Sequence, residues 1–485
     1  MADDARQPLR LSEGDSGKHR KGDPRPQSAV GHGVGIAGLA GLVLWIMIAR
    51  NFGAVMTMLG IGPELFGMTF LPERASGPYS ALMATIFCGV AMVVWSLLVD
   101  KVHRRASTGI DWSAPRPVSE VMDISQIKLA GLWATWAIIA AIYAISRWYW
   151  AGQYVFSMEV FTTLAPLLFI GSIPYVIWLD RYLVEPKDGA WHFGAMLCGQ
   201  AGWDREAIAN HARSWLVKGF FLAFMISIVP GGFADIVQLR LADIIGNPVL
   251  IAHWLIIAMF VVDVQFATVG YMLTMKPLDA HIRTANPYLA GWLAALICYP
   301  PFILMGDGGP LNYHVNTADW AYWFAGNTPL LIVWGAALVF LTAVYAWATV
   351  AFGLRFSNLT HRGILTHGPY GWTKHPAYLA KNLYWWLATL PFLTTSGSFT
   401  DMVRNTALLA LVSGVYYWRA RTEEKHLMAD PDYAAYAAWM DRNAMIPRSI
   451  NALAGRLVGW RRPQPVAPQG KPDSGSATDD VAPAE

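Results

Sequence analysis

Charged residues are scarce in this 485-residue chain, because Asp, Glu, Lys and Arg together make up only 14% of it. A typical soluble domain carries about 25%, and 55% of the residues here are hydrophobic. The charges are also unevenly placed, since none occurs between Asp319 and Arg355. A membrane span needs roughly 20 mostly apolar residues. The scarcity of charge therefore excludes an ordinary soluble globule and predicts a chain that crosses the membrane repeatedly.

Cysteine is rare as well, with only three residues in the chain: Cys88, Cys198 and Cys298. Their odd number and wide spacing exclude a disulfide framework and a zinc-binding pattern. The net charge of +3 is too small to indicate a nucleic acid partner. The histidines of the C-terminal region lack the spacing of helical metal ligands, so we expect no metal site.

Ten apolar segments have the length of membrane spans, which predicts an all-α, polytopic helical bundle. When the N-terminus is placed in the cytoplasm, 30 of the 36 Lys and Arg residues fall on the cytoplasmic side. This bias follows the positive-inside rule and predicts a protein of the cell membrane with both termini in the cytoplasm. The expected spans are residues 33–49, 79–99, 129–146, 155–179, 215–234, 248–275, 286–306, 329–353, 378–396 and 402–418.

The chain divides into four expected regions. The polar residues 1–32 and the Pro-, Ala-, Gly- and Asp-rich residues 451–485 are expected to be disordered tails. Residues 33–320 form a membrane region of seven spans, and residues 321–450 hold the last three spans with a cytoplasmic helix. Within the seven-span region, Asp263 is either a functional group or the buried polar partner of another span, because ionisable residues inside membranes are functional candidates.

A segment of turn-forming and helix-starting residues opens the C-terminal quarter. It reads Gly368-Pro-Tyr-Gly-Trp-Thr-Lys-His-Pro-Ala-Tyr378. The Gly-Pro pair predicts a turn. Because the residue before a proline avoids the helical region and proline favours the first helical position, a helix is expected to begin at Pro376. His375 then lies at the mouth of this helix, at the membrane surface.

Two adjacent carboxylates follow the apolar hairpin of the last two spans. The segment reads Arg421-Thr-Glu-Glu-Lys-His-Leu427. Neighbouring residues on a helix point about 100° apart, so one carboxylate could face a ligand while the other pairs with Arg421 or Lys425. Since two spans return the chain to the face it started from, we expect His375 and Glu423 at the same membrane face.

The chain continues with Asp430-Pro431, which predicts a helix start. Tyr433 and Tyr436 then share one face of that helix. Together, the Gly-Pro-Tyr and Lys-His-Pro-x-Tyr elements, the hairpin, the Glu-Glu pair and the tyrosine pair resemble the isoprenylcysteine carboxyl methyltransferase family. Membrane phospholipid methyltransferases are its wider relatives. The resemblance covers about the last quarter of the chain and implies an integral membrane methyltransferase that uses S-adenosylmethionine.

The resemblance also implies where the site lies. Lys374 stands at the position of the family's usual arginine, and Arg442 is nearest to a late arginine of the family that has no match in register. We take both as catalytic candidates that would orient the acceptor. The acceptor would be a lipid or another amphiphilic molecule with a carboxylate, amine or thiol. The implied cofactor-binding residues are Gly368, Pro369, Tyr370, His375, Tyr378, Glu423 and Glu424.

Two other classes of protein stay open. Sterol reductases are similar in span number and C-terminal layout, and they use NADPH. They typically carry Asn before the motif tyrosine and Gly after it, whereas this chain has Ala377 and Leu379-Ala380 there. The other class is a non-catalytic transporter or assembly protein, for which Asp263 is the only support. The sequence names neither the acceptor nor the oligomeric state.

Overall fold

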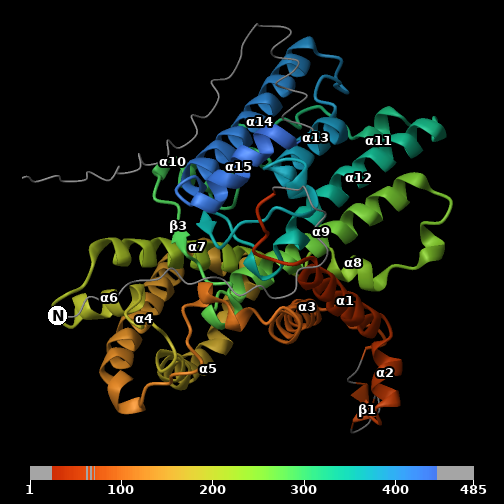
Figure 1. Cartoon of the computed structure of the whole chain (residues 1–485). Helices are drawn as coiled ribbons and strands as arrows, with labels where there is room; N and C mark the ends of the chain where they lie inside the picture. Colours follow the sequence, from red (N-terminus) through yellow and green to blue (C-terminus); the bar gives the residue numbers. More distant parts are fainter. Residues whose placement is uncertain (1–24, 62–63, 66–67, 70–71, 445–485) are drawn as a thin grey trace, which may run out of the picture.

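A computed structural model describes residues 25–61, 64–65, 68–69 and 72–444 of the chain (Figure 1). Within these residues, seven helical segments are long and apolar enough to cross a membrane, which confirms a polytopic helical protein. They comprise α1 His32–Arg50, α3 Pro78–Leu98, α4 Val118–Ile145, α5 Tyr154–Asp180, α7 Arg205–Ile228 with α8 Phe233–Gln238, α9 Pro248–Met272 and α12 Thr328–Phe352.

The long helices begin at residues that favour helix starts. Prolines stand at the first position of α3 and α9 and at the second position of α12, where a missing N–H costs nothing. The side chain of Asn247 accepts hydrogen bonds from the first N–H groups of α9. Small residues then allow close packing: a Cβ on Gly41 of α1 would stand 2.4 Å from the carbonyl oxygen of Phe87 on α3. Local capping and close contact together fix how these helices pack.

Three expected spans differ from this pattern. The segment 286–306 is not one helix, because α10 covers only Leu289–Leu296 and Pro300-Pro301 lack the N–H groups that would continue it. Helix α13, Pro376–Thr389, has 14 residues. Helix α14, Phe399–Leu427, has 29 residues and extends past the expected span 402–418. The shorter elements are α2 Phe52–Met58, α6 Gly189–Leu197 and α11 Trp320–Trp323.

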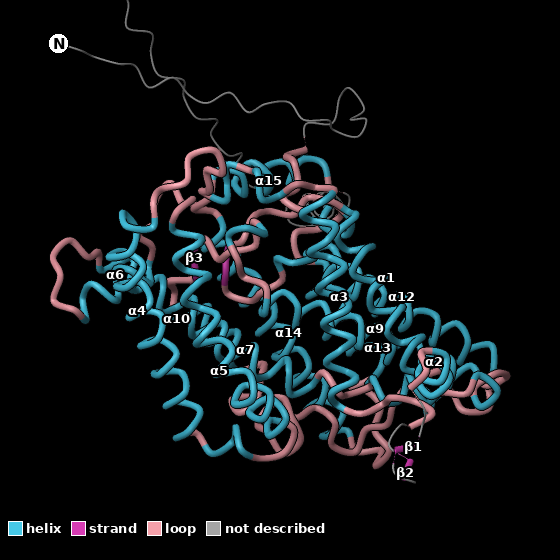
Figure 2. The backbone as a smooth tube through the Cα atoms, turned by 90° about the horizontal axis from the view of Figure 1, so that it is seen from below, coloured by secondary structure: helices cyan, strands magenta, loops and turns pink. Residues whose placement is uncertain are grey.

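The two ends of the bundle carry different elements. Helix α15, Pro431–Asn443, lies among the loops at one end, and the antiparallel strands β1 Glu64–Leu65 and β2 Met68–Thr69 lie at the other (Figure 2). At the α15 end, β3 Thr284–Ala285 pairs antiparallel with β4 Thr360–His361. This pairing joins the upstream membrane region to the loop that precedes the Lys-His-Pro motif.

The two expected tails fall mostly outside the described residues. This holds for residues 1–24 and for residues 451–485. Residues 25–31 are described, and they pack against the loop 363–371: Ala29 N–H donates to the carbonyl of Ile364 over 2.8 Å. The segment before the first helix thus belongs to the same end of the bundle as the C-terminal motifs.

Candidate active site

The motif loop enters helix α13 as its sequence predicts. The turn Gly368–Gly371 is a short 3-10 helix, with Gly368 in the left-handed region at φ +58°. A Cβ there would also stand 3.2 Å from the indole nitrogen of Trp347, so glycine suits the position on both counts. Helix α13 then begins at Pro376, and His375 precedes it in a non-helical conformation.

Glu424 ties this loop to helix α14. Its Oε1 accepts from His375 Nε2 at 3.1 Å and lies 3.2 Å from Lys374 Nζ, and its Oε2 accepts from Arg421 Nη1 at 2.8 Å. Burial alone would raise the pKa of Glu424, but the hydrogen bond from His375 and the charges of His375 and Lys374 lower it to about 2. Glu424 is therefore a carboxylate held among cations.

Glu423 has different surroundings from its neighbour. Its Oε2 accepts a 2.9 Å hydrogen bond from the hydroxyl of Tyr378. The ring of Tyr378 stacks on the ring of His375, with centroids 5.6 Å apart and planes 7° apart. The hairpin thus brings the His-Pro-x-Tyr element and the glutamate pair together, as the sequence predicts. It also divides the pair, since Glu424 binds the loop while Glu423 faces a cavity.

This cavity lies between α14 and the upstream segment 286–291. Its empty space is about 290 Å³, a figure that includes open solvent at its mouth. The wall combines a carboxylate, a guanidinium and aromatic and amide groups. Residues that form it include Asn286, Gly291, Tyr378, Arg419, Glu423 and His426. Burial, helped by the charges of His361 and Arg213, lowers the pKa of His426 to about 4.

Helix α15 packs against the motif loop. Asp430 caps it by accepting from the backbone N–H groups of Asp432 and Tyr433, as the sequence predicts. The hydroxyl of Tyr436 donates to the carbonyl of Tyr370 over 2.8 Å. Pro369 is buried, and the ring of Tyr370 packs edge-on against Phe352. Pro369 and Tyr370 therefore shape the loop and are not among the residues that line the cavity.

The two catalytic candidates lie in different places. Lys374 Nζ stands 3.2 Å from Glu424 Oε1 and 3.6 Å from Asp441 Oδ1, so it links the loop to both α14 and α15. Arg442 is exposed near the end of α15 and does not belong to the cavity wall. The structure therefore brings Lys374 to the other site residues and leaves Arg442 apart from them.

Arg419 and Asn286 are polar residues of the wall that were not predicted as site residues. Arg419 lies four residues before Glu423 and therefore on the same helical face, a spacing that would have indicated it. Asn286 is 1% exposed and donates from Nδ2 to the carbonyl of Thr422 over 3.5 Å. No sequence signal marks Asn286, because only the folded chain places the upstream segment beside α14.

Residues 25–31 form a strap over the motif loop. Ser28 Oγ lies 2.7 Å from His367 Nδ1, and Thr366 Oγ1 donates to the carbonyl of Pro26 over 2.8 Å. The guanidinium of Arg25 lies over the ring of Trp439 on α15, at 5.0 Å from its centroid. The strap thus fastens the loop and α15 from the N-terminal side.

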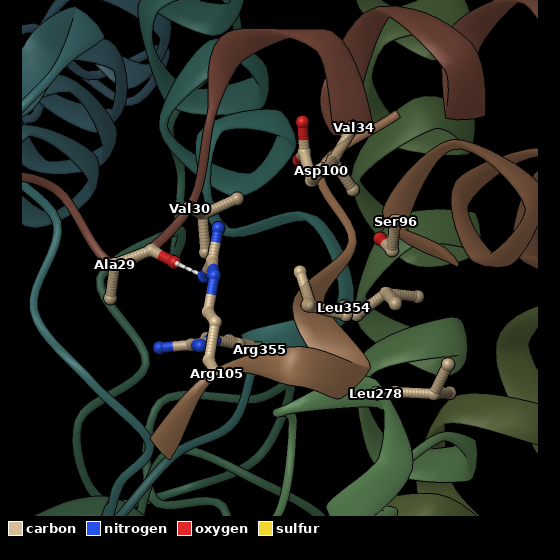
Figure 3. A pocket seen from close by; sticks show the side chains of 10 residues that line it. Ala29, Val30, Val34, Ser96, Asp100, Arg105, Leu278, Leu354 and Arg355 are labelled. Atoms are coloured by element: carbon tan, nitrogen blue, oxygen red, sulfur yellow. Dashed lines mark hydrogen bonds between the residues drawn. The ribbon is translucent and has the colours of Figure 1, made fainter. Parts of the chain in front are cut away.

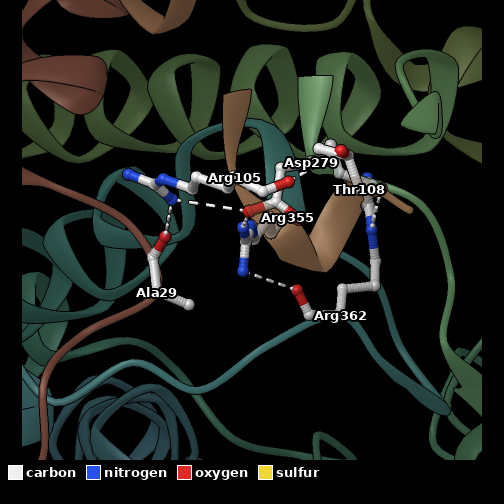
Figure 4. A network of polar contacts seen from close by, with 7 residues as sticks. Ala29, Arg105, Thr108, Asp279, Arg355 and Arg362 are labelled. Carbon is white, nitrogen blue, oxygen red and sulfur yellow. Dashed lines mark hydrogen bonds and ion pairs between the residues drawn. The ribbon is translucent and has the colours of Figure 1, made fainter. Parts of the chain in front are cut away.

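A buried ionic network holds the loop on its other side (Figure 4). The carboxylate of Asp279 lies 2.5 Å from Arg355 Nη2 and 3.5 Å from Arg105 Nη1. Arg105 donates to the carbonyl of Ala29, beside a small pocket that Figure 3 shows. Arg355 donates to the carbonyl of Arg362, whose own guanidinium donates to several backbone carbonyls. The network joins the strap, the upstream region and the loop.

Asp263 has partners on a neighbouring helix. Tyr345 donates its hydroxyl to Oδ2 over 2.8 Å, and Thr349 donates its hydroxyl to Oδ1. Both partners lie on α12, so the carboxylate links α9 to the first helix of the C-terminal region. Asp263 is thus paired with polar side chains of another span, which is one of the two interpretations that the sequence left open.

Comparison with known proteins bears on the C-terminal region. Residues 329–429 match the model of the isoprenylcysteine carboxyl methyltransferase (ICMT) family. No curated protein and no solved structure matches the chain. The matched segment runs from α12 through the motif loop and the hairpin to the end of α14, and so includes both glutamates. The match confirms, for residues 329–429, the resemblance seen in the motifs.

Proposed function

We propose that the protein is an integral membrane methyltransferase that uses S-adenosylmethionine and acts on an amphiphilic or membrane-presented acceptor. The observation that supports this best is the pairing of Tyr378 with Glu423 and of His375 with Glu424 within one site. The match of residues 329–429 to a methyltransferase family agrees with it. We propose Tyr378 and Glu423 as direct cofactor ligands, with His375 and Glu424 holding the loop around them.

The residues suit the chemistry of methyl transfer. When bound, S-adenosylmethionine supplies an electrophilic methyl group on a sulfonium, together with hydroxyl and ammonium groups that carboxylates bind well. Glu423 offers such a carboxylate beside the ring of Tyr378, which can stabilise a nearby cation. An in-line displacement chiefly needs donor and acceptor aligned and water excluded. An acceptor carboxylate would be ionised at neutral pH and would need no base.

We propose that the remaining helices complete a ten-span protein of the cell membrane with both termini in the cytoplasm. Helices α13 and α14 would form the last hairpin, and the segment 286–306 would cross as α10 followed by irregular chain. Irregular backbone is tolerated at membrane depth where protein covers it, and Cys298 packs with Leu409 and Tyr416 of α14. The distribution of Lys and Arg supports this orientation.

Binding measurements would test the proposed class. Purified protein is titrated calorimetrically with S-adenosylmethionine and, separately, with NADPH. We expect micromolar binding of S-adenosylmethionine, with affinity reduced at least tenfold in Glu423→Gln and unchanged in Glu120→Gln, which alters an exposed glutamate on α4. Binding of NADPH alone would favour a reductase, and binding of neither cofactor would contradict an enzyme of either class.

A further inference from the structure

Two opposite charges face the cavity from one helix without forming an ion pair. Arg419 and Glu423 are four residues apart on α14, and both belong to the cavity wall. Arg419 is 5% exposed, yet within the described part of the chain no carboxylate lies within 4.0 Å of its guanidinium. Buried charges are normally paired. Arg419 is therefore a buried cation without a carboxylate partner among the described residues, and an anionic group of a ligand could pair with it.

The groups that contact this guanidinium are neutral. Arg419 Nη2 donates to Asn358 Oδ1 over 2.6 Å and to the hydroxyl of Tyr299 over 3.3 Å. Its guanidinium also lies 5.2 Å from the ring centroid of Tyr378 and 5.8 Å from that of Tyr416. Rings and amides orient a guanidinium, but a carboxylate binds its planar fork in a bidentate manner and far more strongly.

The spacing of the two charges suits a zwitterion. Four residues of helix separate Arg419 from Glu423 by a rise of about 6 Å. This rise separates the two backbone positions, and both side chains extend from the helix into the cavity wall. A ligand that carries an ammonium and a carboxylate on one carbon atom could therefore bind Glu423 with one group and Arg419 with the other, through a hydrogen bond of about 2.8 Å at each end.

The upstream membrane region contributes Asn286 and Gly291 to the wall of the same cavity. Asn286 is fixed there, since its Oδ1 accepts from the N–H of Tyr288 over 2.9 Å. A Cβ on Gly291 would stand 2.5 Å from Asn286 Nδ2, so only glycine leaves room for the amide. Both residues lie outside the part of the chain that matches the ICMT family.

We infer that this cavity binds the α-amino acid head of S-adenosylmethionine, with Glu423 on the ammonium, Arg419 on the carboxylate and Asn286 closing the wall. The inference rests on the proposed function. It adds to it the orientation of the cofactor and a role for the region before residue 329. That region would complete the cofactor site as well as embed the enzyme in the membrane.

Truncated ligands test the inference on the unaltered full-length protein. Calorimetry would compare S-adenosylmethionine with its decarboxylated form, which lacks only the carboxylate, and with methylthioadenosine, which lacks the head. We expect the decarboxylated form to bind about 10- to 100-fold more weakly, as for a lost charge-assisted hydrogen bond, and methylthioadenosine to bind more weakly still. Equal binding of all three would overturn the inference while leaving the proposed function intact. Failure of S-adenosylmethionine itself to bind would instead contradict the proposed function.

A variant then assigns the carboxylate to its partner. Arg419→Gln should lose affinity for S-adenosylmethionine by the same factor and bind the decarboxylated form as the unaltered protein does. Equal loss for both ligands would show a structural role and overturn the assignment. Arg404→Gln, which alters an exposed arginine of the same helix, should change neither affinity.

Discussion

The Glu424→Gln variant offers the sharpest test of how the motif loop is held. The substitution keeps the shape of the side chain and removes the charge that His375, Lys374 and Arg421 share. A glutamine oxygen could still accept one hydrogen bond, but its NH₂ group would face a cation. We therefore expect the loop to detach from α14 more readily and the affinity for S-adenosylmethionine to fall.

The magnitude follows from the pKa of Glu424, which lies at about 2 in the folded protein against 4.5 in a free side chain. At about 1.36 kcal/mol per unit, this difference corresponds to about 3 kcal/mol. The side chain is 14% exposed, so we expect about 2 kcal/mol after solvent screening, or about 30-fold in affinity if the whole loss falls on loop closure.

The sign of the pH dependence follows from the same difference. Because folding lowers this pKa, the stabilisation is fully present above about pH 4.5 and is lost as the pH falls toward 2. Calorimetry at pH 7.5 should therefore show weaker binding by Glu424→Gln, and thermal unfolding should show lower stability than in Glu120→Gln. Unchanged affinity together with unchanged stability would refute the reasoning.

Three further predictions concern the supports of the site. Asp279→Asn should destabilise the protein by about 3–5 kcal/mol, because it leaves Arg355 buried without its carboxylate; thermal unfolding in detergent would measure this, and an unchanged midpoint would contradict it. Ser28→Ala should cost about 1 kcal/mol at the strap and speed hydrogen exchange in residues 363–371, whereas unaltered exchange would show that the strap is not fastened there. Asp263→Ala should lower the thermal midpoint by removing the acceptor of two hydroxyls, without the loss of cofactor affinity that a direct ligand would show.

The sequence predicts those parts of the site that depend on local helix-starting residues or on the number of spans between two segments, which decides whether they lie at the same membrane face. Pro376 and Pro431 start helices where expected because proline suits the first helical position wherever the chain permits it. The expected placement of His375 and Glu423 at the same face follows from a hairpin that returns to its own end of the bundle, whereas the hydrogen bond of His375 goes to Glu424, which the sequence did not specify. A run of hydrophobic residues does not show where a helix is interrupted. The segment 286–306 was therefore expected to be one helix, whereas α10 covers only Leu289–Leu296.

The parts that the sequence does not predict depend on tertiary contact. Asn286 joins the cavity only because β3 pairs with β4 and carries the upstream segment to α14. The strap was expected to be disordered from its polar composition, yet Ser28 contacts His367, which lies 339 residues further along the chain. Arg419, by contrast, could have been predicted as a site residue, because its four-residue spacing from Glu423 is visible in the sequence.

Methyl transfer itself tests the central claim most directly. Full-length protein in lipid vesicles is incubated with S-adenosylmethionine and an isoprenylcysteine that bears a free carboxyl group, the acceptor that the family description names, and with a lipid extract as the alternative acceptor. Formation of S-adenosylhomocysteine is measured over time. The account predicts product with at least one acceptor, reduced at least tenfold in Glu423→Gln and retained in Glu120→Gln. Product formation that is the same in Glu423→Gln as in the unaltered protein, or absent although the cofactor binds, would contradict it.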